Sequence, residues 1–208
     1  PKIGRFYKEV LIHFGVGPEG ASSCCPQMLG QPCKLCQEGW NVFNKAKDLK
    51  TQGLIERGEK LANYSRELRH TRYFFSYVLD RRNEDAGWQA WAYPEKTLSG
   101  VSGLLNDPVT GALRPIDNWQ EAHDLFFTWK KEGGAKYTTV CNLQLDMAVT
   151  PLSNSQERIG ELLTWIRNNP IESLLHFMDP DDLYELAMGS CEDPEGDHPP
   201  LEDEGLYG

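Results

Sequence analysis

Apolar and aromatic residues gather in short runs over the first 150 residues, in the manner of β-strands. The runs RYFFSYVL (72–79) and WQAWAY (88–93) are rich in aromatic and β-branched side chains and are separated by polar turn residues, so they predict a β-hairpin. DLFFTWKK (124–131) and KYTTVCNLQLDMAV (136–149) predict a second hairpin. With one more strand at 9–14, the chain has about five strands, enough for a small barrel.

The last of these runs has a regular alternation. Cys141, Leu143, Leu145 and Met147 occupy every second position, which predicts that they share one face of the strand. We therefore expect this face to be the core face and Cys141 to be a core thiol rather than a metal ligand.

Helical spacing of apolar residues is found in two other parts of the chain. Apolar residues recur at intervals of three over 40–49, and a second, more polar helix is predicted at 54–68. After the strands, apolar positions spaced three and four apart over 159–166 predict an amphipathic helix, and two shorter helices are expected around 171–177 and 181–187. The pattern as a whole predicts a mainly β chain with helical additions.

Four potential metal ligands lie within the stretch HFGVGPEGASSCCPQMLGQPCKLC. They are His13, Cys25, Cys33 and Cys36, and Cys24 is an alternative to Cys25. A CxxC pair can bind one ion with two thiolates at a tight turn, and a third thiolate and an imidazole complete a tetrahedral site with no open position for water. The sequence therefore predicts one structural Zn²⁺ per chain rather than a catalytic metal.

Other readings of these cysteines are less well supported by the residues. They could be buried free thiols beside an unrelated histidine, but the compact CxxC, Cys and His pattern is fairly specific. A disulfide framework is not required, because a chain of 208 residues can bury a core without cross-links. A zinc-dependent deaminase would match the segment PCKLC, but its HxE motif requires glutamate where this chain has Gly15. We find no paired nucleophile and base, and we expect a protein that is not an enzyme.

Acidic residues are concentrated at the C-terminal end. The net charge is −10; residues 1–150 hold 19 Lys/Arg against 17 Asp/Glu, and residues 151–208 hold 2 against 14. The last nineteen residues, SCEDPEGDHPPLEDEGLYG, carry seven acids, three prolines and no Lys or Arg. This composition predicts a disordered acidic tail at 190–208, which either improves solubility or binds a partner.

Cations and aromatic rings are interleaved between residues 66 and 93, a composition that suits a groove for single-stranded nucleic acid. Any base can stack on a ring, and Arg or Lys can neutralise the phosphates. Aromatic residues of strands equally often fill a core, so for each ring both roles stay open. The candidate DNA-binding residues are Arg66, Arg69, His70, Arg72, Tyr73, Phe74, Tyr77, Arg81, Arg82, Trp91, Lys130 and Lys131.

The order of these features resembles the single-stranded DNA-binding proteins of tailed bacteriophages, including the helix-destabilising proteins of the T-even phages. The resemblance covers roughly residues 9–152 and the acidic tail, and it is carried by the His and Cys of the knuckle with CPQMLGQPCKLC, by RHTRYFFSYVL and by WAYPEKTLSGVSGLL. It implies a five-stranded oligonucleotide-binding (OB) barrel with a zinc-knuckle insert. It also implies a protein that binds and protects single-stranded DNA in phage replication, recombination and repair, in the cytoplasm of a bacterial host cell.

The resemblance also assigns roles to individual residues. His13, Cys25, Cys33 and Cys36 match the family's zinc ligands. The run from Arg69 to Arg72 matches its basic, hydroxyl-containing segment, and Tyr73 and Phe74 match aromatic positions of its DNA groove. The resemblance further implies self-association on DNA and an acidic tail that binds replication and recombination proteins; the tail candidates are Glu202, Asp203, Glu204, Leu206 and Tyr207.

From these features we expect three parts. A nucleic-acid-binding core spans 1–152 and contains the knuckle at about 13–36 and a helical insert at about 37–68; a helical appendage follows at 153–189, and then the tail. The alternative function is a zinc-knuckle module for protein interaction or transcription regulation. No apolar stretch approaches the roughly 20 residues that cross a bilayer.

Overall fold

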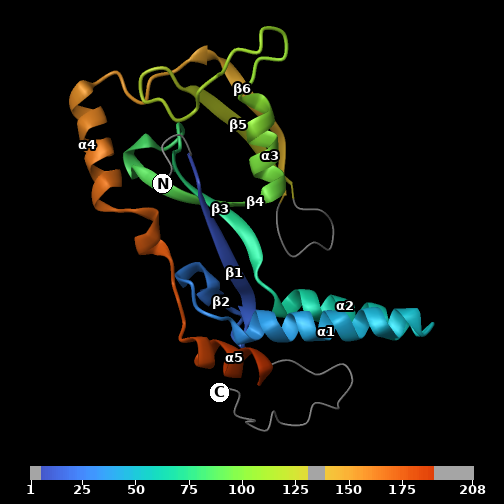
Figure 1. Cartoon of the computed structure of the whole chain (residues 1–208). Coiled ribbons are helices and arrows are strands. Elements are labelled where there is room, and N and C mark those ends of the chain that lie inside the picture. Colours follow the sequence, from blue (N-terminus) through green and yellow to red (C-terminus); the bar gives the residue numbers. More distant parts are fainter. Residues whose placement is uncertain (1–5, 131–138, 190–208) are drawn as a thin grey trace. The chain divides into compact units, whose positions relative to one another are not determined.

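The computed structural model describes residues 6–130 and 139–189, without the side chains of Trp129 and residues 139–141. It is a mixed α/β structure (Figure 1). Its strands are β1 (Lys8–Val16), β2 (Ala21–Cys24), β3 (Thr71–Leu79), β4 (Trp88–Pro94), β5 (His123–Lys130) and β6 (Thr139–Val149). Its α-helices are α1 (Lys34–Thr51), α2 (Ile55–Leu68), α3 (Glu95–Leu104), α4 (Gln156–Asn168) and α5 (Pro180–Met188). Three short 3₁₀ helices are η1 (Pro26–Leu29), η2 (Glu84–Ala86) and η3 (Ile171–Leu174).

The chain packs as two compact units. Unit 1 contains the described residues up to Val10 together with Arg72–Leu175, and unit 2 contains Leu11–Thr71 together with the described residues from His176 onward. These units do not coincide with the predicted boundary at residue 152, since α4 belongs to unit 1 and α5 to unit 2. The physical reason is that α5 buries Leu183 and Ala187 in the hydrophobic core of α1 and α2.

The described strands form two separate sheets. The larger sheet has the order β2-β1-β3-β4, and β5 and β6 form a two-stranded sheet. The first and second predicted hairpins are therefore confirmed as β3–β4 and β5–β6, both antiparallel. A mixed fold with an antiparallel sheet is confirmed, whereas a single closed barrel of five strands is not observed among the described residues.

The β3–β4 ladder has one buried face and one mixed face. On the buried face, Phe74 and Tyr93 are paired and stacked with their ring centroids 6.3 Å apart. Ser76 Oγ is 2.7 Å from the Tyr93 hydroxyl, and burial raises the pKa of Tyr93 to about 12. On the other face, α4 covers one end of the ladder, where Trp88 Nε1 donates to the Leu162 carbonyl at 2.8 Å. The buried face forms part of the core of unit 1.

Helices α1 and α2 lie side by side in unit 2 (Figure 1). Their contacting faces carry small and aliphatic residues, and two glycines let the backbones approach closely. A Cβ atom on Gly39 would lie 3.1 Å from the Ser65 carbonyl oxygen, and one on Gly58 would lie 2.9 Å from that of Ala46. The predicted helices at 40–49 and 54–68 are confirmed, and the first begins earlier than expected, at Lys34.

The alternation predicted for β6 is interrupted. Asn142 has a φ of +50°, and the register shifts between Phe126 and Thr128 of the partner strand, as in a β-bulge. A second register shift lies between His123 and Leu125, opposite the stretch from Leu145 to Val149, so Met147 does not continue the face of Leu143 and Leu145. Met147 is 69% exposed, so the prediction that it faces the core is wrong. The side chain of Cys141 lies outside the described part.

The helices after the strands are confirmed in part. α4 begins at Gln156, and its N-cap Ser155 accepts a hydrogen bond from the Arg158 amide. Of the two shorter helices, the first is only the 3₁₀ turn η3, and the second is α5. Within the described ranges, no helix combines the length and the apolar character needed to span a membrane.

Candidate metal centre and candidate nucleic-acid interface

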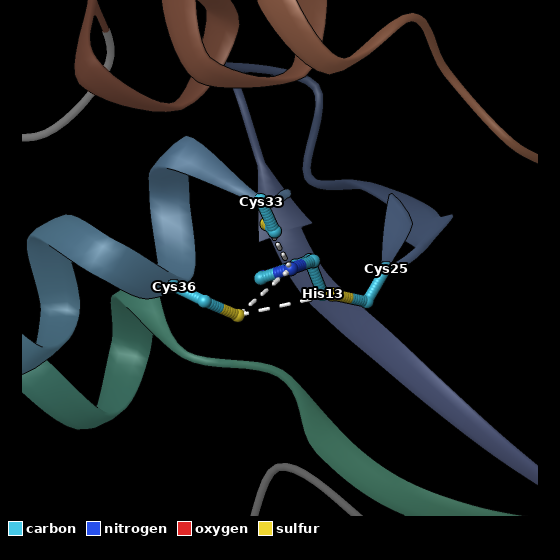
Figure 2. Close-up of side chains that lie close together, drawn as sticks. All are labelled: His13, Cys25, Cys33 and Cys36. Atoms are coloured by element: carbon cyan, nitrogen blue, oxygen red, sulfur yellow. Dashed lines mark hydrogen bonds between the residues drawn. The ribbon is translucent and has the colours of Figure 1, made fainter. Parts of the chain in front are cut away.

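Three neighbouring elements of unit 2 bring four potential metal ligands together. His13 lies on β1 with 1% of its surface exposed. Cys25 is the N-cap residue of η1, and its amide donates to the Leu11 carbonyl of β1 at 2.8 Å. Cys33 is the N-cap residue of α1 and Cys36 lies in the first turn of that helix, so the CxxC pair presents both sulfur atoms from one helix end. Figure 2 shows the four side chains pointing toward one another.

The distances in this cluster suit one tetrahedral ion. The four ligand atoms lie within 4.8 Å of one another, and all four residues are buried. Cys25 Sγ is 3.8 Å from Cys36 Sγ, and His13 Nε2 is 3.4 Å from Cys33 Sγ and 3.6 Å from Cys36 Sγ. Metal bonds of about 2.3 Å to sulfur and about 2.05 Å to nitrogen give tetrahedral edges of about 3.8 Å between sulfurs and about 3.6 Å between sulfur and nitrogen. The cluster could therefore bind one metal ion.

Hydrogen bonds within the cluster already favour a thiolate. Hydrogen bonds from Cys25 and Cys33 hold the pKa of Cys36 far below its usual range, whereas bonds to Cys33 and Cys36 raise that of Cys25. Burial alone would lower the pKa of His13, but its hydrogen bonds to the two sulfurs of Cys33 and Cys36 raise it to about 9. A metal that binds here displaces these protons, and it takes the place of the hydrogen bonds that hold the cluster together.

Cys24 and His70 both lie near the cluster, but only His70 is within hydrogen-bond distance of one of its sulfur atoms. Cys24, the alternative ligand, is buried but is not part of the group of four; its amide donates to the His176 carbonyl at 2.8 Å. His70 follows α2, and its Nδ1 lies 3.1 Å from Cys36 Sγ. His70 is thus placed to donate a hydrogen bond to the Cys36 thiolate, a role that the sequence analysis missed.

Several cations predicted to bind DNA have partners within the chain. Arg72 Nε lies 3.0 Å from Glu9 Oε1. Arg81 is bound by both carboxylate oxygens of Asp124 and by the carbonyls of Pro151 and Leu152, so it joins the β5–β6 hairpin to β3. Its predicted contact with phosphate is therefore replaced by a structural role.

The remaining predicted cations are more open. Arg66 is exposed and donates to Asn63 Oδ1 at 3.0 Å. Arg82 is exposed in the turn after β3, and Lys130 is exposed at the end of β5. Arg69 is half-buried against aromatic rings of α1. Lys131 and the tail candidates Glu202, Asp203, Glu204, Leu206 and Tyr207 lie outside the described residues.

The predicted aromatic residues are divided between core and surface. Phe74 is 4% exposed and packs on Tyr7 and Tyr93, so its predicted place in a groove is wrong and it is a core residue. Trp91 is half-buried and stacks on Phe127 with the ring planes 2° apart. The Tyr77 hydroxyl donates to the Asn169 carbonyl at 2.8 Å.

Tyr73 is half-buried and shares the mixed face of β3–β4 with Phe75, a ring of the interleaved segment 66–93 that is not among the candidate DNA-binding residues. Tyr73 is paired with Pro94 and Phe75 with Ala92, and both partners are exposed. The Phe75 ring, like that of Tyr73, is half-buried. Strand alternation predicts this arrangement, because it places 73 and 75 on the opposite face from 74.

Comparison of the chain with protein-family models, with curated proteins and with solved structures found no match.

Proposed function

We propose that this protein binds and protects single-stranded DNA without catalysing a reaction, and that the His13, Cys25, Cys33 and Cys36 cluster holds one structural Zn²⁺. The observation that carries the proposal is the pair of half-buried rings, Tyr73 and Phe75, on the mixed face of an antiparallel sheet. Rings that project from a sheet can stack on unpaired bases, which are not available in a duplex. An OB-like barrel and a role in phage replication, recombination and repair follow from the resemblance and belong to the same proposal.

Zinc is the metal that this ligand set favours. Three thiolates and one imidazole in a tetrahedral arrangement are typical of structural Zn²⁺ sites. All four ligands are buried, so the ion would have no open position for a substrate or a reactive water. The chemistry of the site is therefore structural: it fixes η1 and the start of α1 relative to β1.

Direct titration tests the proposed function. Fluorescently labelled oligo(dT) and a duplex of equal length are titrated with the zinc-loaded chain at two salt concentrations. We expect preference for the single strand and weaker binding at higher salt, because Arg and Lys release counterions from the phosphates. Equal affinity for the duplex, or no binding in dilute buffer, would refute the proposal.

We expect Tyr73→Ala and Phe75→Ala each to weaken oligo(dT) binding about tenfold, since one base–ring stack contributes about 1–3 kcal/mol. Phe126→Ala is the matched control, because Phe126 is also a strand phenylalanine of unit 1 and is 53% exposed. Affinity is measured by fluorescence anisotropy. If the three variants bind alike, the Tyr73 and Phe75 face is not the stacking surface.

The acidic segment at 190–208 is proposed to compete with DNA for cationic residues or to bind replication and recombination proteins. Its seven acids and its lack of Lys and Arg support this role. Deletion of the segment should raise DNA affinity at low salt, where electrostatic interactions are strongest. Unchanged DNA affinity would exclude competition with DNA, and binding of partner proteins would then be the role proposed for the segment.

Removing the hydrogen bond between His70 and Cys36 should loosen the metal. The 3.1 Å contact can offset the negative charge of a metal-bound thiolate, and outer partners of this kind typically change metal affinity about 10- to 100-fold. We therefore expect His70→Ala to release Zn²⁺ to a chromogenic chelator about ten times faster than the wild type, whereas His70→Asn, which can keep an N–H donor, should be closer to it. Equal release from all three would show that His70 has no such role.

A module for protein interaction is the second candidate function. It is favoured by the internal ion pairs of Arg72 and Arg81, which reduce the cationic surface available to phosphates. The oligo(dT) titration separates the two functions, because a protein-interaction module would show no preference for single strands.

A further inference from the structure

The first half of α1 carries an aromatic surface in unit 2 that the proposed function does not use. Trp40 is 52% exposed, although tryptophan is the largest apolar side chain. Its ring meets the ring of Phe43 edge to face, with the centroids 5.7 Å apart. The guanidinium carbon of Arg69 lies 4.5 Å from the centre of the Trp40 ring and 5.2 Å from that of Phe43.

The chain holds Arg69 in this position. Its Nε donates to the Ser65 carbonyl at 3.1 Å, which fixes the side chain at the end of α2. Gly39 makes room for it, since a Cβ there would lie 2.6 Å from the Arg69 Cγ. A cation fixed against two rings loses little side-chain freedom when a ligand binds.

Charge is segregated around α1. Trp40, Phe43 and Lys47 are spaced by three and four residues and so share one side of the helix, with the Lys47 ammonium 5.9 Å from the centre of the Phe43 ring. The acidic residues of α1 are Glu38, which helical spacing places on the opposite side, and Asp48, which lies between the two sides. The aromatic side therefore carries positive charge.

We propose that Trp40, Phe43, Lys47 and Arg69, here called the α1 patch, form a second contact surface for single-stranded nucleic acid. Bases would stack against the exposed Trp40 ring while Lys47 and Arg69 neutralise neighbouring phosphates. The proposal rests on the proposed function, and it extends binding to a helical surface in unit 2.

Nucleic acid fits the α1 patch better than an acidic peptide does. The patch offers one large exposed ring and fixed cations close to it, and a single strand repeats a planar base and a phosphate at every nucleotide. An acidic peptide supplies the charge but few planar rings. The segment HPPLEDEGLYG of this chain, for example, has three acids and one tyrosine.

Crosslinking and a matched charge reversal test the proposal. Oligo(dT) containing 5-iodo-deoxyuridine is irradiated with the zinc-loaded full chain, and the crosslinked residues are identified by mass spectrometry. In parallel, affinity is measured for Trp40→Ala, Lys47→Glu and Lys45→Glu. Lys45 lies on the same helix two residues from Lys47, but it shares the side of Glu38.

We expect crosslinks at Trp40 or Phe43, and about tenfold weaker binding for Trp40→Ala and for Lys47→Glu than for Lys45→Glu. Far-UV circular dichroism confirms that the variants are folded. If wild-type protein binds oligo(dT) but the α1 patch is not crosslinked and Lys47→Glu matches Lys45→Glu, the patch proposal is overturned while the proposed function stands. If wild-type protein does not bind oligo(dT), the patch proposal and the proposed function are both refuted. The patch proposal would also be overturned, in favour of an acidic ligand, by a different pair of results. In that case Trp40→Ala would weaken binding of the synthetic peptide HPPLEDEGLYG but would leave the affinity for DNA unchanged.

Discussion

Removal of the metal with a chelator is expected to unfold most of unit 2. Structural zinc sites contribute about 10–16 kcal/mol of apparent binding free energy, which is comparable to the whole stability of a domain. The four ligands belong to β1, η1 and α1, and three of them are members of the hydrophobic core that also contains α2 and α5. Loss of the ion would leave three buried sulfur atoms and a buried imidazole to be held by hydrogen bonds alone.

The two adjacent cysteines provide a matched test of this expectation. Cys25→Ser removes a ligand, and an equal share of the zinc contribution corresponds to about 3 kcal/mol or more. Cys24→Ser changes the same chemical group at a buried position outside the cluster, so it should retain one zinc per chain. Melting followed by circular dichroism at 222 nm reports mainly unit 2, because α1, α2 and α5 belong to it, whereas α3 and α4 belong to unit 1. Zinc content is measured by elemental analysis. Equal zinc content and equal melting temperature for the two variants would contradict the assigned ligand set.

Leu183→Ala is expected to destabilise unit 2 by about 2–5 kcal/mol, the cost of emptying a fully buried leucine site. Leu183 is 0% exposed and lies in the core with α1 and α2, although it is more than a hundred residues later in the sequence than either helix. The effect is measured by denaturant unfolding in excess Zn²⁺. It tests whether α5 is an integral part of unit 2 rather than an appendage.

Leu29→Ala is the control for this substitution. Leu29 belongs to the same unit but is 57% exposed, so its loss should change stability by less than about 0.5 kcal/mol. If Leu183→Ala is as mild as Leu29→Ala, α5 does not contribute to the core of unit 2, and the helix is an appendage as the sequence pattern indicated.

Local features of the chain were predictable because their causes are local. The aromatic and β-branched runs of β3 and β4, the helical spacing in α1 and α2, and the spacing of His13 and the cysteines all act over a few residues. The earlier start of α1 had no capping signal, since its N-cap residue Cys33 makes no side-chain cap hydrogen bond. The bulge at Asn142 had no local signal either, because its neighbours continue the alternation.

The sequence by itself determined the strands, the helices and the set of residues from which a metal site could be built, since periodicity and ligand spacing are properties of neighbouring positions. Only the tertiary structure decided which of these residues meet. It selected Cys25 over Cys24, brought His70 to Cys36, buried Phe74 and paired Arg72 and Arg81 with carboxylates. The physical reason is that burial and pairing depend on groups from distant parts of the chain, and a linear pattern does not contain their distances.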